Sequence, residues 1–264
     1  ARWWSSIRWR PVTATSALVL DAAGRLPLAS RVGDVWPEAA PEIARSTLED
    51  LLRHRTGLRR WMPLYATCRD ERELAARLLG GDWLRDGDDA VYSDLDVMLW
   101  TLTAERALDD TYWRLLRRHV LARLGDADFA ATGRAGARAL ACRLTTGREV
   151  ELARAEGLDV DELAAPARGE AQDGNCRHLG RPFGHAGVFA TAAGMERLAR
   201  EWLRPRGLLT ETMVARALGG DDRFALGWYR RGETAASRGL GAGAFGHDGF
   251  TGGTVWVDPG AGRL

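Results

Sequence analysis

The chain has 264 residues, of which 28% are charged, and a formal net charge of +1. This length allows one large domain or two small ones with a substantial core. The balanced charge gives no electrostatic basis for binding nucleic acid or an anionic membrane, and no apolar run approaches the ~18 residues of a transmembrane segment.

The basic residues restrict the chemistry. All 37 are arginine, because the chain contains no lysine. Arginine stays protonated at ordinary pH, so it cannot take up a proton as a lysine amine can. A mechanism that needs a lysine amine is therefore excluded.

Metal and disulfide signals are weak. The three cysteines are too few and too scattered for a disulfide scaffold or a zinc site, although a single disulfide and three reduced thiols both fit their spacing. Three histidines stand apart in the sequence, as surface histidines usually do: His54, His119 and His178. No pair of histidines or carboxylates has metal-ligand spacing, so we expect neither a metal nor another cofactor.

Residues 1–10 have two interpretations. As a strand, they place Ser5 and three apolar residues on one face and arginines on the other. As a loop, they lead into a helix over about 11–23, which Pro11 would start and Gly24 would end. This helix is rich in Ala, Val and Leu and nearly uncharged, which predicts burial on most sides.

Capping residues predict the next helices. Ser46-Thr47-Leu48-Glu49 is a capping box that opens a helix over Thr47–Arg55. Four further helices are expected: one after Asp70 that ends at Gly80-Gly81, one over 111–124 capped by Asp110, one from Thr191 to about Leu203, and one from Thr210 to Gly219.

The stretch from Asp89 to Asp94 opens another helix, because apolar residues recur at helical spacing after it. Ser93 is predicted to cap this helix, with Asp96 as its partner in a capping-box variant. Tyr92, held before a helix start beside a hydroxyl and a carboxylate, is a candidate proton-handling group. The alternative is that Tyr92 only packs its ring.

The second half of the chain changes character. Residues 126–180 lack a clear period, which predicts surface excursions with a short strand near 139–144. Strands are expected at 224–229, 245–251 and 252–258. Helices in the middle and strands at the end are typical of an α+β fold. We expect a single domain over 1–264, with a helical part at about 40–220 and a sheet part at about 224–264, joined in one interpretation by 1–10.

Four segments resemble the serine β-lactamase and penicillin-binding-protein superfamily, in its class C-like and esterase-like branch. They are Ser46–Leu58, similar to a helix that ends in His-Thr-Ser-Gly-Leu; Tyr92-Ser93-Asp94, similar to Tyr-Ser-Asn; Gly184–Ala192, similar to Gly-His-Ala-Gly-Leu-Phe-Ser-Thr-Ala; and Gly246–Gly252, similar to the His-Thr-Gly strand. The resemblance implies a β-lactamase/DD-peptidase-like α+β fold, an antiparallel sheet with a helical subdomain.

The resemblance also implies functional residues. Tyr92 would be the general base or proton shuttle, and Asp94 a hydrogen-bonding residue of the cleft wall. The strand edge that faces the substrate would be formed by His247, Asp248 and Gly249. His185 is either a structural turn residue near the cleft or a functional one. The implied ligand is a small-molecule ester, a β-lactam or a peptidoglycan-like peptide.

The first motif departs from the family. The family's Ser-x-x-Lys-Pro-Val/Phe-Thr-Ala corresponds to residues 7–14, so Ile7 takes the nucleophile position and Arg10 the lysine position. Ser5 and Ser6 are close, but a shift of one or two residues rotates a helical side chain by ~100° or ~200°. The sequence therefore favours a protein that has lost the acyl-enzyme chemistry. The alternative is an active serine hydrolase (an esterase, β-lactamase or D-alanyl peptidase) that uses Ser5 or Ser6 with Tyr92.

The sheet raises a third hypothesis. The family's sheet has strands before the serine helix and a strand and helix at its end, whereas this sequence has ten residues before and almost none after. An incomplete sheet would leave its edges exposed. Three alternatives follow: the sequence is a portion of a longer chain, residues 1–9 form an edge strand, or a protein partner adds a strand and completes the sheet.

Overall fold

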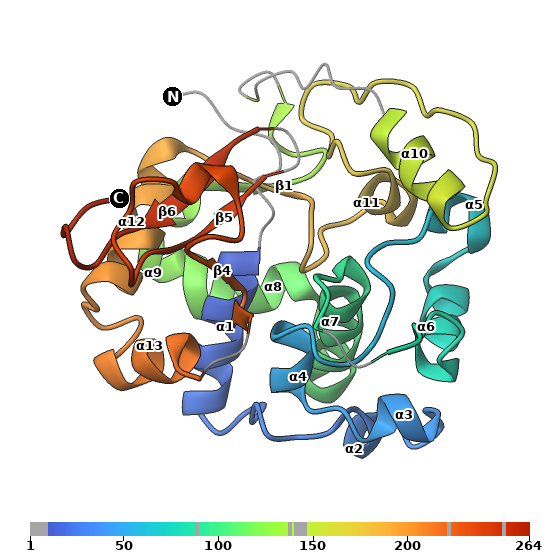
Figure 1. The fold of residues 1–264 in the computed structure, drawn as a ribbon, viewed down its shortest axis with the longest axis horizontal. Coiled ribbons are helices and arrows are strands. Elements are labelled where there is room, and N and C mark those ends of the chain that lie inside the picture. Colours follow the sequence, from blue (N-terminus) through green and yellow to red (C-terminus); the bar gives the residue numbers. More distant parts are fainter. Residues whose placement is uncertain (1–9, 88–89, 137–138, 140–146, 221–222, 250–251) are drawn as a thin grey trace.

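The computed structural model describes residues 10–87, 90–136, 139, 147–220, 223–249 and 252–264 (Figure 1). Its α-helices are α1 (Arg10–Ala22), α2 (Val32–Val35), α3 (Pro41–Ala44), α4 (Leu48–Leu52), α5 (Leu64–Thr67), α6 (Glu71–Gly80), α7 (Asp94–Leu108), α8 (Tyr112–Leu116), α9 (Ala122–Leu124), α10 (Gly147–Ala155), α11 (Gly174–Leu179), α12 (Ala192–Leu203) and α13 (Glu211–Leu218). The strands are β1 (Phe129–Ala131), β2 (Val188–Ala190), β3 (Phe224–Ala225), β4 (Trp228–Arg230), β5 (Phe245–Asp248) and β6 (Thr254–Val257).

The main sheet is antiparallel throughout, with strand order β3-β4-β5-β6. The stretch 224–229, which the sequence predicts as one strand, is instead a tight hairpin of β3 and β4. The chain reverses at Gly227, whose φ of +71° is a left-handed value that glycine adopts without a steric penalty. The stretch 245–251 contains the strand β5, and the strand expected at 252–258 is confirmed as β6, which is shorter than predicted.

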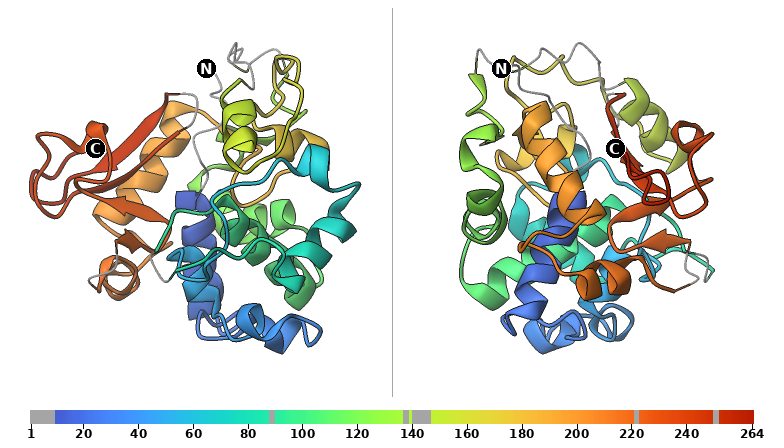
Figure 2. Two further views of the ribbon diagram at one scale, coloured as in Figure 1. Left: turned by 45° about the vertical axis from the view of Figure 1, so that its right-hand side comes forward. Right: turned by 90° about the vertical axis from the view of Figure 1, so that its left-hand side faces the viewer.

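Helix α1 lies between the sheet and the helical half (Figures 1 and 2). Its predicted burial is confirmed, because ten of its thirteen residues are buried. The buried Trp202 of α12 donates its indole N–H to Thr15 of α1 at 2.9 Å. The Trp202 ring also packs edge-on against Trp228 and Phe245 of the sheet. Through these contacts α1, α12 and the sheet share one hydrophobic core.

Most predicted caps are confirmed. Each of the following accepts a hydrogen bond from the backbone N–H three residues later: Asp70, Ser93, Thr191 and Thr210. Asp96 does not complete the predicted box, since the Ser93 N–H points to His54 Nδ1 instead (3.4 Å). Between α8 and α9 the predicted helix at 111–124 contains one π-helical stretch, η1 (Arg117–Leu121), and its N-cap is Thr111 rather than Asp110.

Other predictions need correction. The N-cap of α4 is Thr47, whose box partner is Asp50, and α4 ends at Leu52 rather than Arg55. Residues 126–180 hold β1, α10 and α11 as well as loops, and β1 pairs with β2 in a second, two-stranded sheet. Most of the strand expected near 139–144 lies outside the described residues. So do residues 1–9, including Ser5, Ser6 and Ile7.

Two further observations concern the described part of the chain. Cys68 and Cys176 are buried free thiols, whereas Cys142 lies outside the described residues. Within those residues, every helix is too short or too polar to cross a bilayer.

We expect Gly227→Ala to be far more damaging than a matched glycine substitution. A Cβ at Gly227 would lie 2.6 Å from the Ala14 Cβ and 3.0 Å from the Arg10 carbonyl oxygen, so α1 and the hairpin would have to separate. Overpacking of this kind costs about 1–3 kcal/mol beyond the backbone strain of about 1 kcal/mol.

Gly239→Ala is the control, because its φ is +79° but no atom lies within 4 Å of the added Cβ. Chemical denaturation of both variants measures the free energy of unfolding. Equal losses would show that the close approach of the hairpin to α1 is wrong.

Candidate functional site

A residue just before the start of α7 contacts the strand β5, as expected from the resemblance that assigns both segments to one site. The Tyr92 and His247 ring centroids are 5.9 Å apart. Tyr229 of β4 lies against both rings, stacked on Tyr92 at 5.4 Å and tilted against His247 at 4.6 Å. All of these contacts are within the core, since Tyr92 and His247 are 5% and 1% exposed.

Arg10, the first residue of α1, holds this cluster together. Its side chain is completely buried, and its Nη2 donates to Asp94 Oδ1 at 2.6 Å and to the Ser93 carbonyl oxygen at 2.9 Å. The guanidinium carbon lies 3.5 Å from the centroid of the Tyr92 ring, a cation–π contact. The Tyr92 hydroxyl in turn donates to Asp94 Oδ1 at 3.4 Å. Arg10 thus fixes both predicted cleft residues of the Tyr-Ser-Asp motif.

His54 is not the surface residue that the sequence suggests. It is 4% exposed and lies among Arg10, Tyr92 and Phe224. Its φ of +59° is left-handed, which is uncommon for a residue other than glycine. This backbone turn is the reason that α4 ends early, because it swings the ring out of the helix direction and into the core.

The carboxylate of Asp96 contacts the ring of His54. The Nδ1 of His54 lies 3.2 Å from Asp96 Oδ2, and the Thr56 hydroxyl donates to the other Asp96 oxygen. Burial raises the pKa of Asp96 well above its usual range. The motif His-x-Thr-Gly (His54–Gly57) therefore contributes a network of hydrogen bonds through Asp96 that supports the site. Sequence spacing alone did not reveal this network.

The strand-edge residues have defined contacts. His247 Nδ1 lies 3.0 Å from the Asp248 carbonyl oxygen, and the Asp248 carboxylate accepts a hydrogen bond from the Trp256 indole at 3.0 Å. Gly249 donates its N–H to the Gly253 carbonyl at 2.6 Å, which closes the turn between β5 and β6. Ser5 and Ser6 lie outside the described residues, so their distance from Tyr92 stays open.

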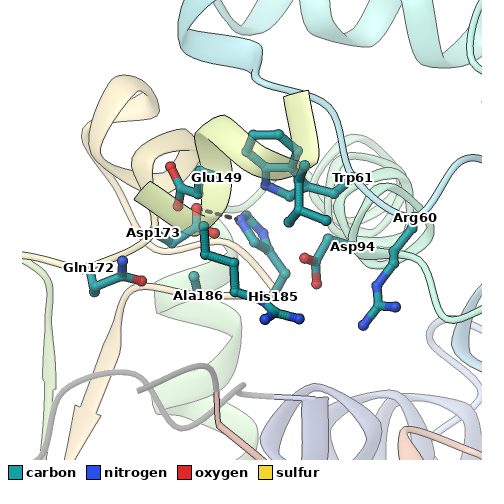
Figure 3. Close-up of a pocket in the computed structure, with 10 residues that line it drawn as sticks. Arg60, Trp61, Asp94, Glu149, Gln172, Asp173, His185 and Ala186 are labelled. Atoms are coloured by element: carbon teal, nitrogen blue, oxygen red, sulfur yellow. Dashed lines mark hydrogen bonds and ion pairs between the residues drawn. The ribbon is translucent and has the colours of Figure 1, made fainter. Parts of the chain in front are cut away.

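A pocket opens beside Asp94 and holds about 600 Å³ of space, part of it open to solvent. It is lined by Arg60, Trp61, Asp94, Arg148, Glu149, Leu152, Gln172, Asp173, His185 and Ala186. Figure 3 shows His185 in the centre, with Glu149 and Asp173 to one side and Trp61, Asp94 and Arg60 to the other. Of these, the sequence predicted only Asp94 and, as one alternative, His185.

Three hydrogen bonds fix the walls of this pocket. The Asp94 N–H donates to the Arg60 carbonyl at 2.9 Å, which ties the chain before Trp61 to the start of α7. Asn175 of α11 bridges the same loop, since its Oδ1 accepts from the Leu64 N–H at 2.8 Å and its Nδ2 donates to the Met62 carbonyl at 2.8 Å.

Glu149 and Asp173 form an acidic pair at the back of the pocket. Glu149 is only 2% exposed, and its Oε1 accepts from the Gly174 N–H at 3.0 Å. Burial, and next the negative charge of Asp173, raises the pKa of Glu149 to about 8. Asp173 Oδ1 caps α11 through the Cys176 N–H (2.7 Å) and lies 3.1 Å from His185 Nε2. Both acids come from the aperiodic stretch, where no sequence signal marks them.

In the ranges that the structure describes, no three His, Cys, Asp or Glu residues are grouped so as to hold a metal ion. The site combines two features: the buried guanidinium of Arg10 against the Tyr92 ring, and a neighbouring pocket with acidic, basic and aromatic walls.

Comparison with known proteins bears on these observations. A family model described as β-lactamase matches residues 10–263. A search of curated protein sequences gave no match.

Three solved structures are similar. A β-lactamase from Mycobacterium bovis has 20% identity and a TM-score of 0.61, over 99% of this chain and 77% of that chain. A penicillin-binding-protein homologue from Caulobacter crescentus has 22% identity and a TM-score of 0.69, over 99% and 76%. A class C β-lactamase from Rhodobacter sphaeroides has 17% identity and a TM-score of 0.67, over 99% and 78%. The predicted β-lactamase/DD-peptidase-like α+β fold is confirmed.

We expect Arg10→Met to lower the free energy of unfolding by about 3–5 kcal/mol, because it leaves the Asp94 carboxylate buried without its counter-charge. The double variant Arg10→Met/Asp94→Leu should recover part of this loss. Chemical denaturation of the single and double variants measures the coupling. Arg200→Met is the control: its ion pair with Glu196 is exposed, so the loss should stay below about 1 kcal/mol.

We expect Glu149→Gln to stabilise the protein increasingly from about pH 5 to pH 8. The folded pKa of about 8 lies above the unfolded value near 4.5, so the native wild type binds the extra proton and loses stability as pH rises through this window. The amide removes the ionisation and keeps an acceptor for Gly174. The gain at pH 8 should be on the order of a few kcal/mol and should vanish near pH 4.5. A difference in unfolding free energy that is flat with pH would contradict the buried environment of Glu149.

Proposed function

Because the chain belongs to the β-lactamase family, whose members are serine hydrolases of the β-lactamase and penicillin-binding-protein type, we propose that it keeps the family's cleft without the acyl-enzyme chemistry. In this proposal the protein binds a small-molecule ester, a β-lactam or a peptidoglycan-like peptide and releases it unchanged. The proposed binding site is the pocket beside the start of α7, which Asp94 lines.

One observation carries the proposal: Arg10, at the position of the family's lysine, is buried and paired with Asp94. The family's acylation needs a group that takes the proton of the attacking hydroxyl, because the neutral hydroxyl is a poor nucleophile. A guanidinium presents only donors and stays charged, so it cannot take that proton. The Arg10 Nη2 lies 2.6 Å from the Asp94 carboxylate.

The contacts of Tyr92 support the same conclusion. The guanidinium of Arg10 covers one face of its ring, and the phenolic hydroxyl donates its proton toward Asp94. A tyrosine that serves as a general base must instead point its oxygen, deprotonated, at the nucleophile.

We expect the wild-type protein to give no covalent adduct with a fluorescent penicillin or an aryl phosphonate ester, as measured by gel fluorescence and intact mass. Ile7→Ser/Arg10→Lys restores both residues of the family motif and should gain an adduct, and Tyr92→Phe in that background should slow its formation about 100-fold or more. Ile7→Ser alone is the matched control, because it supplies the hydroxyl but keeps the guanidinium; it should stay unlabelled.

The opposite result is equally clear. A wild-type adduct on Ser5 or Ser6 that disappears in Tyr92→Phe would overturn the proposal. It would establish the alternative, an active serine hydrolase that uses a displaced serine.

A further inference from the structure

We propose that the pocket beside Asp94 binds the carboxylate of a small organic acid, and that Arg60 and Arg148 hold this group. The inference rests on the proposed function, since it names the ligand class of a cleft that binds without hydrolysis. It assigns the ligand's charge to the wall formed by the loop before α5 and by α10.

The first step concerns the ionised acids of the pocket, which already have partners inside the protein. Asp94 is paired with Arg10 at 2.6 Å. Asp173 lies 3.1 Å from His185 Nε2 and also accepts the Cys176 N–H. Both carboxylates therefore already have a partner inside the protein.

Glu149, the third acid, contributes little charge at neutral pH. It is almost fully buried, and its Oε2 makes no hydrogen bond. The groups around it are Asp173, Arg177 of α11 and Asp94 of α7, and the balance of burial and these charges raises its pKa to about 8. Near pH 7 the carboxyl is thus mostly protonated, so it does not balance a positive charge.

Arg60 and Arg148 bring two guanidinium groups to the pocket. Both line the pocket, both are exposed, and they come from separate segments. In the part of the chain that the structure describes, neither guanidinium makes a hydrogen bond or an ion pair; the guanidinium carbon of Arg60 is 5.5 Å from the Tyr92 ring centroid. A guanidinium can bind a carboxylate through two parallel N–H···O hydrogen bonds. These charge-assisted bonds are stronger than hydrogen bonds between neutral groups.

The remaining lining selects the type of anion. Trp61, Leu152 and Ala186 give the pocket an apolar side, which suits an organic body next to the charged group. Asp94 and Asp173 line the same space, so a doubly charged phosphate would meet more repulsion than a singly charged carboxylate. A monocarboxylate with an apolar substituent fits both conditions.

The test compares matched acids and amides. Wild-type protein is titrated at pH 7 with phenylacetate, 4-phenylbutyrate and N-acetylglycine, and with the primary amide of each, by isothermal calorimetry and ligand-observed NMR. At least one acid should bind about tenfold or more tightly than its amide, as expected for a charge-assisted pair. If no acid binds more tightly than its amide, the proposal is overturned.

Variants locate the contact. Arg60→Gln and Arg148→Gln should each weaken the acid about fivefold or more while leaving the amide unchanged. Arg123→Gln is the matched control, since Arg123 is an exposed arginine of α9 that does not line the pocket, and its variant should bind like the wild type. Equal losses in all three variants would indicate a general charge effect and would overturn the site.

The same samples keep the two proposals apart. Both arginines are exposed, and thermal unfolding of the variants confirms that they fold. Intact mass measured after a parallel incubation of the same proteins with the fluorescent penicillin, which carries a reactive acyl group, detects any acyl adduct. An adduct on the wild type would reject the proposed non-hydrolytic function even if Arg60 and Arg148 bind the acid. Unmodified protein that ignores the acids would reject only this inference.

Discussion

The buried ion pair between Arg10 and Asp94 is the constraint on which the rest of the site depends. It joins the first turn of α1 to the first turn of α7, the two helices at the centre of the molecule (Figure 1). A buried ion pair adds little net stability, because desolvation offsets most of the attraction, but breaking one side of it is costly. Its main effect is therefore geometric: it fixes the Tyr92 ring under the guanidinium and directs the Tyr92 hydroxyl toward Asp94. The fold therefore surrounds a buried ion pair, in which the negative charge of Asp94 offsets the positive charge of Arg10.

Much of the fold could be predicted from local sequence. Caps such as Ser93 and Thr191 work within one helical turn, so their effect is visible in four residues. The errors arise where distant contacts decide. The end of α4 is set by His54, whose left-handed backbone is held by Arg10 and Asp96 from other helices. The short pairing of β1 with β2 joins segments about sixty residues apart and has no periodic signal.

The candidate site likewise has one part that the sequence predicted and one part that it did not. The proximity of Tyr92 and His247 followed from the order of motifs, and the structure places their rings together. Glu149 and Asp173 could not be anticipated, because a carboxylate becomes unusual only through burial and neighbours, which are properties of the folded chain. The absence of lysine was visible from the start, but only the folded chain shows that the arginine at position 10 lies against the Tyr92 ring.

The pairing of Arg10 with Asp94 also constrains how the sequence can change. Arg10→Lys keeps a positive charge beside the carboxylate, so this step leaves the pair electrically intact. Asp94→Asn taken first would strand a guanidinium in the core, together with its contacts to Ser93 and His54. Replacing Arg10 by another cationic residue first is therefore tolerated better than replacing Asp94 first. The effect of a substitution at either position of the buried ion pair thus depends on the residue present at the other.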